Sequence, residues 1–572
     1  MLAKRLRGAL LMLCVAGGAV APQAAQAGAQ AAIGAEAAGQ RLSAAPVDIA
    51  SLDEYIERTR QQWEVPGTAV GVIHDGKVAY AKGFGAREIG KSARVDDGTL
   101  FEIGSLTKAF TATALALLVD EGRLSWDDPV VRYLPSFRLS NPALTPLVTV
   151  RDLVAHRTGF EGGMAAVKPT DAAGILRDSH LLKPIVPFRD EVLYSNSMYS
   201  IAGEVVAAVS GMSWSQFVQR RLLDPLKMAS SGASADLMGI WDAAHIAPSM
   251  YGQAPAGRAG IEDAPGKNVI MPHYHTADGV RPLPWQISLK GGDAAGSMVS
   301  NLQDLLSWVR FNLGDGRDAS GTRLLQQATL EEVHRPQHFI RHPVSGSHQA
   351  LAMLFERVSP TAQPDAYAMG WFCQSYRGMH LLTHGGALLG GMSLIAMLPE
   401  KGIGVVVLAN SYGKDGNGLF NDAVAMGILD RLVAEKPFDW NGELLKIADE
   451  RETAERASDA ALEKARLRGT KPSLPLESYV GDYQNPQFGH VRIERAGKGL
   501  ALRVPGVLDW PLEHWHNDTF RMQLTTSGVP LFPIFAHFEV DPSGRVATFD
   551  PGWVLMGDAF VPVTAGAKAA PR

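Results

Sequence analysis

The chain has 572 residues, of which 46% are hydrophobic and 20% are charged, and it contains 59 glycines and 34 prolines. These proportions exclude a disordered or fibrous chain, and the length predicts two or three packed units rather than one core. The formal net charge of -5 at pH 7 and the lack of a basic run argue against nucleic-acid binding.

The N-terminal segment predicts export. Three basic residues precede an apolar segment over residues 9–21, and a small-x-small pattern follows at residues 25–27. We therefore expect a signal peptide over residues 1–27, a periplasmic or secreted protein, and no stable membrane insertion after cleavage; an uncleaved anchor is the alternative. Cleavage removes three positive charges and no acidic residue, so the formal net charge changes from -5 to -8. It also leaves only Cys373, which excludes an intrachain disulfide.

The first strands are predicted after a small-residue tether over residues 28–47. Two β-rich runs over residues 67–85 flank Asp75-Gly76, which is a strong hairpin signal. Residues 367–409 supply further strands, with a turn at residues 399–402. Strand signals thus lie near both ends of a long stretch with helical patterns between them. We predict an α+β fold in which early and late chain close one antiparallel sheet, flanked by helices, with an inserted and mostly helical region.

Three helices are predicted from their apolar periodicity and end signals. Residues 198–211 end in the expected glycine, and residues 419–433 place apolar side chains on one face. Ser300 and Gln303 have the spacing of a capping box ahead of a third helical pattern. These helices belong to a main domain that we expect over residues 48–440.

The C-terminal part changes character twice. A charged stretch over residues 441–473 predicts a linker helix. Short alternating runs over residues 474–565, separated by Gly, Pro, Asn and Asp, predict a small all-β domain.

The first candidate catalytic pair is Ser105 and Lys108, which precede a long apolar helical pattern that Gly122 closes. Residues at i and i+3 lie on the same face of a helical turn, so the lysine can reach back to the serine hydroxyl. Partial desolvation would favour the neutral amine, which could accept the serine proton. A solvent-facing lysine is the alternative. The second Ser-x-x-Lys match, Ser411 to Lys414, contains a glycine and follows a strand, so we interpret it as a turn.

Two further stretches carry polar groups suited to a shared site. Tyr194 and Asn196 lie in a predicted loop before a helix, where a hydroxyl and an amide can face a ligand. His384, Gly385 and Gly386 lie on a predicted strand, and the glycines would let a substrate lie against the backbone. Alone, each stretch fits an ordinary turn equally well.

Taken in order, these three motifs resemble those of the serine β-lactamase and penicillin-binding-protein superfamily, especially its branch of class C β-lactamases, D-aminopeptidases and esterases. Longer stretches such as LFEIGSLTKAFTATALALLVDEGRLSWDDPVVRYLP also resemble this family, over about residues 48–433. The C-terminal stretch ESYVGDYQNPQFGHVRIE resembles the small lipocalin-like barrel of some relatives. The resemblance therefore implies a β-lactamase/transpeptidase-like fold followed by a small β-barrel.

The resemblance also implies a role for each motif residue. Ser105 would attack a carbonyl group to form an acyl-enzyme, and Lys108 would take its proton. Tyr194 would pass the proton to the leaving group, and Asn196 would hold Lys108 or a substrate amide. The backbone N–H groups of Ser105 and Ala387 would hold the oxyanion, a kind of contact that is typically worth about 3 kcal/mol.

The third motif departs from the pattern of enzymes that act on β-lactams. His384 stands where a permanently charged lysine is expected, and Gly385 replaces a hydroxyl residue, so the clamp on a substrate carboxylate is weakened. This favours an aminopeptidase, amidase or esterase. The alternatives are a β-lactamase or DD-peptidase and, in another class, a penicillin-binding-like sensor or scaffold with little turnover.

The sequence predicts no metal site and no cofactor. The histidine-rich stretches have no Cys partners and no His-Glu-x-x-His pattern, and prolines interrupt them. The expected partner is a small-molecule or peptide substrate, while oligomeric state and the role of Arg157 are not predicted.

Overall fold

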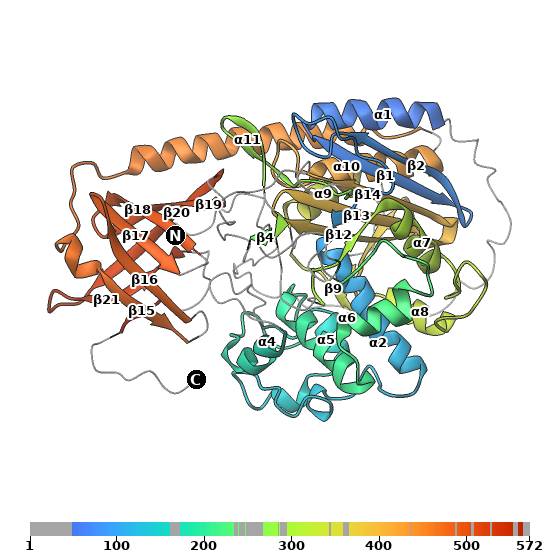
Figure 1. Ribbon diagram of the computed structural model, residues 1–572, viewed down its shortest axis with the longest axis horizontal. Helices are drawn as coiled ribbons and strands as arrows, with labels where there is room; N and C mark the ends of the chain where they lie inside the picture. The colour runs from blue at the N-terminus through green and yellow to red at the C-terminus, as the bar shows by residue number, and fades with distance from the viewer. Residues whose placement is uncertain are drawn as a thin grey trace, which may run out of the picture.

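The computed structural model describes residues 49–160, 172–233, 238, 246–247, 267–283, 285–286, 294–342, 345–358, 365–434, 436–486, 489–504, 508–526, 529–552 and 559–563. The expected signal peptide (1–27) and tether (28–47) lie outside these residues. Figure 1 shows a large unit of sheet and helices and a smaller unit of strands, with the long helix α11 (Trp440–Ala465) running from one toward the other. Among the described residues, no helix combines the length and apolar character needed to cross a membrane.

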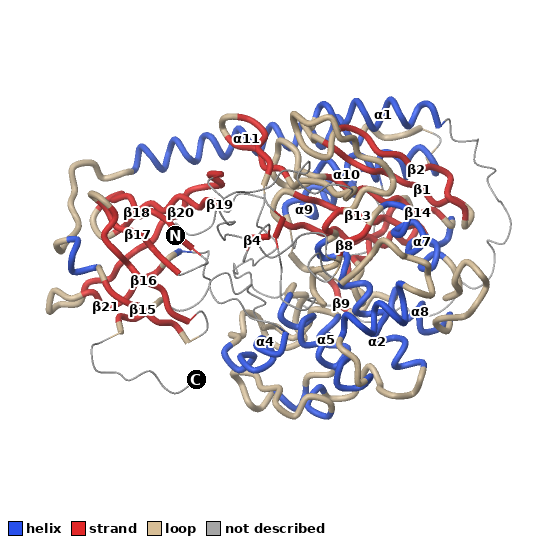
Figure 2. The backbone as a smooth tube through the Cα atoms, in the orientation of Figure 1, coloured by secondary structure: helices blue, strands red, loops and turns tan. Residues whose placement is uncertain are grey.

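The large unit is organised around one antiparallel sheet, seen as a block of strands in Figure 2. Within the described chain its strand order is β2-β1-β14-β13-β12-β11-β10-β9. The strands span Gly67–His74 (β1), Lys77–Gly85 (β2), His338–Phe339 (β9), Ala366–Tyr367 (β10), Phe372–Tyr376 (β11), Met379–Leu388 (β12), Gly391–Leu398 (β13) and Ile403–Ala409 (β14). Thr68 pairs with Ala409 across β1 and β14, so early and late chain close the sheet. The predicted fold class is confirmed.

The side chains of β14 alternate between two hydrophobic cores. Val405 and Val407 pack in the core on one face of the sheet, while Val406 and Leu408 pack in the core on the other. Because both faces are covered by helices, the strand is apolar at every position instead of at every second one.

Helices cover both faces. On one face α10 (Leu419–Val433) lies against β13 and β14, and α1 (Ile49–Gln62) and α11 lie against α10. On the other face α7 (Leu302–Leu313) lies against β1 and β14. The remaining helices are α2 (Thr107–Asp120), α3 (Val150–Val154), α4 (Ala172–Asp178), α5 (Asn196–Ser210), α6 (Trp214–Val218), α8 (Gln327–His334) and α9 (Gly346–Val358).

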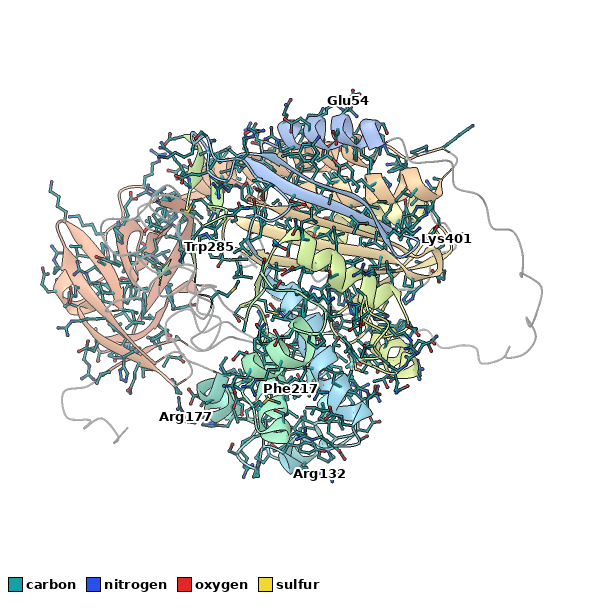
Figure 3. All side chains as sticks on the ribbon, turned by 45° about the vertical axis from the view of Figure 1, so that its right-hand side comes forward. Glu54, Arg132, Arg177, Phe217, Trp285 and Lys401 are labelled. Carbon is teal, nitrogen blue, oxygen red and sulfur yellow. The ribbon has the colours of Figure 1, made fainter. Side chains whose placement is uncertain are left out.

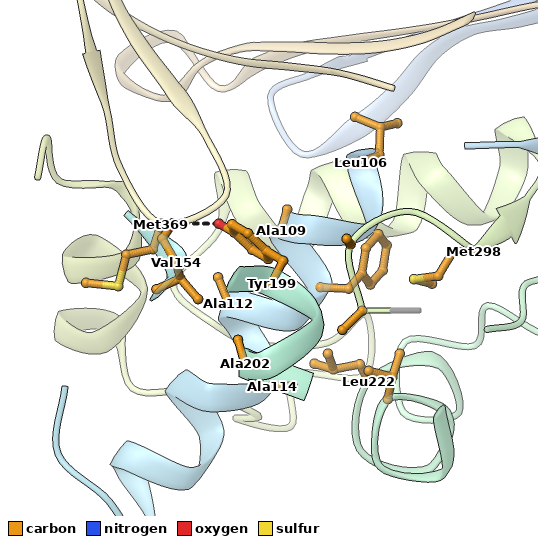
Figure 4. Packing of buried hydrophobic residues seen from close by; sticks show 14 of the residues in the cluster. Leu106, Ala109, Ala112, Ala114, Val154, Tyr199, Ala202, Leu222, Met298 and Met369 are labelled. Atoms are coloured by element: carbon orange, nitrogen blue, oxygen red, sulfur yellow. Dashed lines mark hydrogen bonds between the residues drawn. The ribbon is translucent and has the colours of Figure 1, made fainter. Parts of the chain in front are cut away.

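The inserted region packs α2 against α5. Figure 4 shows Ala109 and Ala112 of α2 beside Tyr199 and Ala202 of α5. Small side chains at this contact let the two helix backbones approach closely. The Tyr199 hydroxyl donates a hydrogen bond to the Val154 carbonyl oxygen at 2.6 Å, which ties α5 to α3.

Short strand pairs complete the large unit: β3 (Phe101–Glu102) with β8 (Val299–Ser300), β4 (Ile246–Ala247) with β7 (Trp285–Gln286), and β5 (His273–Thr276) with β6 (Gly279–Pro282).

The predicted hairpin turn and two predicted helix ends agree with the structure. Gly122 follows the end of α2 with a positive φ of 66°. Asp75 and Gly76 both have positive φ, at 50° and 72°, as a two-residue hairpin turn with matching twist requires. Gly211 ends α5 in the left-handed conformation. The capping box at Ser300 and Gln303 was wrong. The N-cap of α7 is Asn301, whose side chain accepts the Asp304 N–H, whereas the Ser300 hydroxyl contacts Ser231.

The smaller unit is an antiparallel barrel with strand order β21-β20-β19-β18-β17-β16-β15-β22. Its described strands span Gly481–Asn485 (β15), Gly489–Ala496 (β16), Gly499–Val504 (β17), Leu508–His516 (β18), Thr519–Thr526 (β19), Val529–Val540 (β20), Val546–Asp550 (β21) and Val561–Pro562 (β22). Phe549 and Phe560 exchange two backbone hydrogen bonds of 2.8 Å, which close the barrel. Buried aromatic side chains fill its interior, among them Tyr479, Tyr483, Trp510, Phe520 and Phe538.

The barrel docks on the large unit through apolar side chains. Leu283 and Leu389 of the large unit are buried in the same hydrophobic cluster as the barrel core. Figure 3 shows Trp285 on the side of the large unit that faces the barrel. A second contact lies just after the C-terminal end of α11. There the Arg466 guanidinium carbon lies 4.4 Å from the centroid of the Trp515 ring of the barrel.

Candidate active site

Ser105 lies in a single 3₁₀ turn, Gly104–Leu106, between β3 and α2. Gly104 has a positive φ of 52°, which a side-chain-bearing residue rarely adopts, so the turn depends on glycine. Lys108 follows one turn later, in the first turn of α2, and its side chain is completely buried. The helix therefore presents the amine to the serine from the same face.

Among the described residues, the Lys108 amine lies within hydrogen-bond distance of three oxygen atoms. Its Nζ lies 2.9 Å from Ser105 Oγ, 2.7 Å from Asn196 Oδ1 and 2.7 Å from the Ala295 carbonyl oxygen. The last two oxygens can only accept, so they fix two N–H bonds of the amine. The third contact, with Ser105 Oγ, can be made by an N–H of the ammonium or by the lone pair of the neutral amine.

Asn196 reaches the pair from the first position of α5, whose N-cap is Ser195, and Tyr194 lies in the loop just before that cap. Lys108 Nζ lies 4.8 Å from the centroid of the Tyr194 ring. Burial raises the pKa of the Tyr194 hydroxyl well above its usual value, and the nearby Ser105 hydroxyl offsets this only partly. Tyr194 is therefore a neutral phenol. Among the described residues its hydroxyl forms no well-aligned hydrogen bond, although the Ser105 hydroxyl lies close enough to lower its pKa.

Strand β12 lies directly against the Ser105 turn. A Cβ on Gly104 would fall 2.7 Å from the Ala387 backbone nitrogen, and a Cβ on Gly386 would fall 1.9 Å from the Ile103 carbonyl oxygen. The Ser393 hydroxyl on β13 also donates to the Ile103 oxygen, at 2.8 Å. The two glycines thus permit a backbone contact that brings the Ala387 N–H next to Ser105.

His384 is completely buried behind this contact. Its Nδ1 donates to the Gly385 carbonyl oxygen at 2.6 Å, and its Nε2 accepts from the Tyr367 hydroxyl at 3.0 Å. Burial first, and the charge of Lys108 second, lower the pKa of His384 to about 3. The ring is neutral near pH 7 with both nitrogens bonded inside the protein. The expected contact of His384 with substrate stays a prediction. Gly385 and Gly386 follow His384 on β12.

A small apolar cluster borders Tyr194. Val192, Tyr194, Tyr367 and Phe372 are buried together, and Ile340 packs against them. This cluster gives one side of the site an apolar character.

Several other motifs of the sequence lie away from these residues. Arg157 donates to buried Asp152 at 2.5 Å, so it forms a structural ion pair. Ser411 accepts the Gly413 N–H, and Lys414 pairs with Asp449, so the second Ser-x-x-Lys match is a turn. Among the described residues, no group of three or more His, Cys, Asp or Glu side chains could hold a metal ion.

Sequence reasoning missed two contributors. The Ala295 carbonyl is a backbone group and leaves no signature in a sequence. His156 contacts the Tyr194 ring, with centroids 4.2 Å apart, and the only available signal was its position in a loop that resembles the family.

Fold and site together define a β-lactamase-fold serine hydrolase. The chain belongs to the Beta-lactamase family, whose model matches residues 52–426. Residues 465–552 match a second model, described as a domain of unknown function (DUF3471).

Curated relatives and solved structures agree with this assignment. The chain is 26% identical to the unguisins hydrolase ungD of Aspergillus violaceofuscus over 89% of this chain and 90% of that protein. It is also 26% identical to Protein flp of Staphylococcus aureus over 63% of this chain and 62% of that protein. The octameric penicillin-binding protein homologue from Pyrococcus abyssi has a similar fold, with a TM-score of 0.54 and 21% identity over 90% of this chain and all of that one.

Proposed function

We propose that the protein is an exported serine hydrolase that forms an acyl-enzyme on Ser105 and hydrolyses an amide, peptide or ester bond of a small substrate. One observation carries the proposal. The buried Lys108 amine donates to two oxygens that can only accept, and its Nζ lies 2.9 Å from Ser105 Oγ. The proton can therefore move from oxygen to nitrogen without any rearrangement of the side chains.

The reaction begins as Ser105 Oγ bonds to the substrate carbonyl carbon and its proton passes to Lys108 Nζ. The carbonyl oxygen takes up the negative charge and is held by the backbone N–H groups of Ser105 and Ala387. As the bond to the leaving group breaks, that group takes the Tyr194 proton, and Tyr194 regains a proton from Lys108. Water then attacks the acyl carbon by the same route in reverse, which releases the acid and restores the Ser105 hydroxyl.

The surroundings support a substrate that is apolar beside Tyr194. The neutral His384 ring supplies no positive charge for a carboxylate, and the cluster around Phe372 and Val192 is apolar. We therefore favour D-aminopeptidase, amidase or esterase activity over efficient β-lactam hydrolysis. The name of the Aspergillus relative, a hydrolase of unguisins, fits this class.

The test uses fluorophosphonate labelling together with turnover of p-nitrophenyl esters, D-aminoacyl anilides and a cephalosporin. We expect Ser105→Ala to abolish labelling and turnover, and Lys108→Ala to lower turnover by at least about 100-fold, because general-base catalysis is typically worth that much or more. Lys414→Ala, in the second Ser-x-x-Lys match, is the control and should retain activity.

Turnover that survives Ser105→Ala would refute the nucleophile. Labelling of Ser105 without turnover of any substrate would instead favour a sensor.

A further inference from the structure

His156 contacts the Tyr194 ring and the backbone of the residues on both sides of it. The His156 carbonyl oxygen accepts the Leu193 N–H at 2.8 Å. The His156 Nδ1 accepts the Ser195 N–H at 3.0 Å. The imidazole ring also packs on the Tyr194 ring, with centroids 4.2 Å apart and planes tilted by 36°. The backbone is thus held on both sides of Tyr194, and the ring is supported between these two points.

The bonding pattern requires a neutral imidazole with one proton position. Because Nδ1 accepts a backbone N–H, it carries no proton, and the ring hydrogen is on Nε2. His156 is completely buried, and burial, followed by electrostatic interactions with Lys108 and His384, lowers its pKa well below the usual value. Protonation would give Nδ1 a hydrogen aimed at the Ser195 N–H, so a charged ring cannot hold this geometry.

Nε2 has no hydrogen-bond partner among the residues that the structure describes. The ring is surrounded by aromatic rings of Tyr194, Tyr199 and Tyr367, at centroid distances of 4.2, 5.0 and 4.7 Å. A buried donor without an acceptor destabilises a fold by about 1–3 kcal/mol. His156 also has a positive φ of 54°, which is unfavourable for a residue with a side chain. Two unfavourable features at one residue suggest a functional reason for it.

We propose that His156 is a positioning residue that holds the Tyr194 phenol in line with Ser105 and Lys108 by accepting the Ser195 N–H. This inference rests on the proposed function, in which Tyr194 passes a proton to the leaving group. If the turn around Tyr194 loosens, proton delivery suffers, whereas the attack by Ser105 is less affected.

Substrates with different leaving groups distinguish a loss of proton delivery by Tyr194 from a loss of attack by Ser105. p-Nitrophenolate is a stable anion and departs with little help, whereas ethoxide needs a proton as the bond breaks. The measurement is therefore the ratio of kcat/KM for a p-nitrophenyl ester to that for the ethyl ester of the same acid. Tyr194→Phe, which removes the proton donor, should raise this ratio and sets the reference.

Two nearly isosteric variants test the acceptor. Asn tolerates a positive φ, and its Oδ1 occupies the position of Nδ1, so His156→Asn should keep the ratio within about 3-fold of the wild type. His156→Leu has the same shape without an acceptor and should raise the ratio by at least about 10-fold. Because both changes act through one hydroxyl, adding His156→Leu to Tyr194→Phe should raise the ratio no further.

An equal loss for both esters in His156→Leu would overturn the proposal, since that is the effect of a purely structural residue. Independent losses in the double variant would also overturn it. If His156→Leu does not fold, folded His156→Asn decides: an unchanged ratio supports the proposal and a raised ratio refutes it. Failure of the proposed function would be visible earlier, as a wild-type protein that hydrolyses neither ester or a Ser105→Ala variant that keeps its activity.

Discussion

Gly386 is the residue at which strand β12 touches the turn that carries Ser105. An added Cβ would fall 1.9 Å from the Ile103 carbonyl oxygen, closer than any real contact, and both atoms belong to or adjoin rigid backbone. We expect Gly386→Ala to push β12 away from Ser105 and to lower the rate of fluorophosphonate labelling by about 100-fold, the effect of losing one oxyanion donor.

Gly385→Ala is the matched control for stability. Its Cβ would lie 3.5 Å from the mobile end of Met392, which is an ordinary contact. The thermal midpoint of Gly385→Ala should stay close to the wild type, whereas that of Gly386→Ala should fall. Equal labelling rates for Gly386→Ala and the wild type would mean that the contact does not form the oxyanion site.

Motifs predicted the polar residues that the structure brings together, because side chains with reactive groups leave a visible spacing. Lys108 contacts Ser105 and Asn196 as the i,i+3 argument and the family pattern implied. The Ala295 carbonyl could not be predicted, since every residue has one. The burial of His384, which decides its charge, could not be predicted either, because it depends on Tyr367 and on other chain segments that converge only in the fold.

Helix α7 supports β1 and β14 from the face that also carries the inserted region, and its start is fixed by Asn301. The Asn301 side chain accepts the Asp304 N–H at 2.9 Å, whereas Gln303, the second residue of the expected capping box, is exposed. We predict that Asn301→Ala lowers the free energy of unfolding by about 1 kcal/mol, the usual effect of losing an N-cap.

Gln303→Ala provides the comparison for this helix. Urea denaturation of both variants should show a change within about 0.5 kcal/mol for Gln303→Ala, as for other exposed substitutions. A larger loss for Gln303→Ala than for Asn301→Ala would restore the capping box that the sequence suggested.

Element types were predictable where one physical signal dominated. Positive φ at Asp75 and Gly76, and at Gly211, follows from the residues themselves. The apolar face expected for the helix over residues 419–433 is buried, but the remaining sides of α10 are buried as well. The side of α10 that faces away from the sheet is covered by α1 and α11, which come from the two ends of the large unit. A local sequence pattern cannot predict packing between such distant segments.

At the scale of the whole molecule, the barrel and the candidate site meet at one turn. Leu389, two residues beyond Ala387, is buried in the barrel's hydrophobic cluster. The other side of the turn is held by β5, whose His273 N–H donates to the Gly390 carbonyl oxygen at 2.9 Å and which itself contacts barrel strand β20. Among the residues that the structure describes, the cores on the two sheet faces contain none from the barrel.

We therefore predict that a chain ending after Lys471 folds and still labels at Ser105, within about 10-fold of the full-length rate, since β12 keeps its sheet partners and the His273 contact. It should lose stability through exposure of Leu283 and Leu389, at about 1.5–3 kcal/mol for each side chain. Calorimetry and labelling measure the two effects. Full-length Leu389→Ser is the control, because it weakens docking without removing the barrel. If the truncated chain does not fold while Leu389→Ser does, the barrel is an integral part of the hydrolase fold, and its influence on the site cannot be separated from folding.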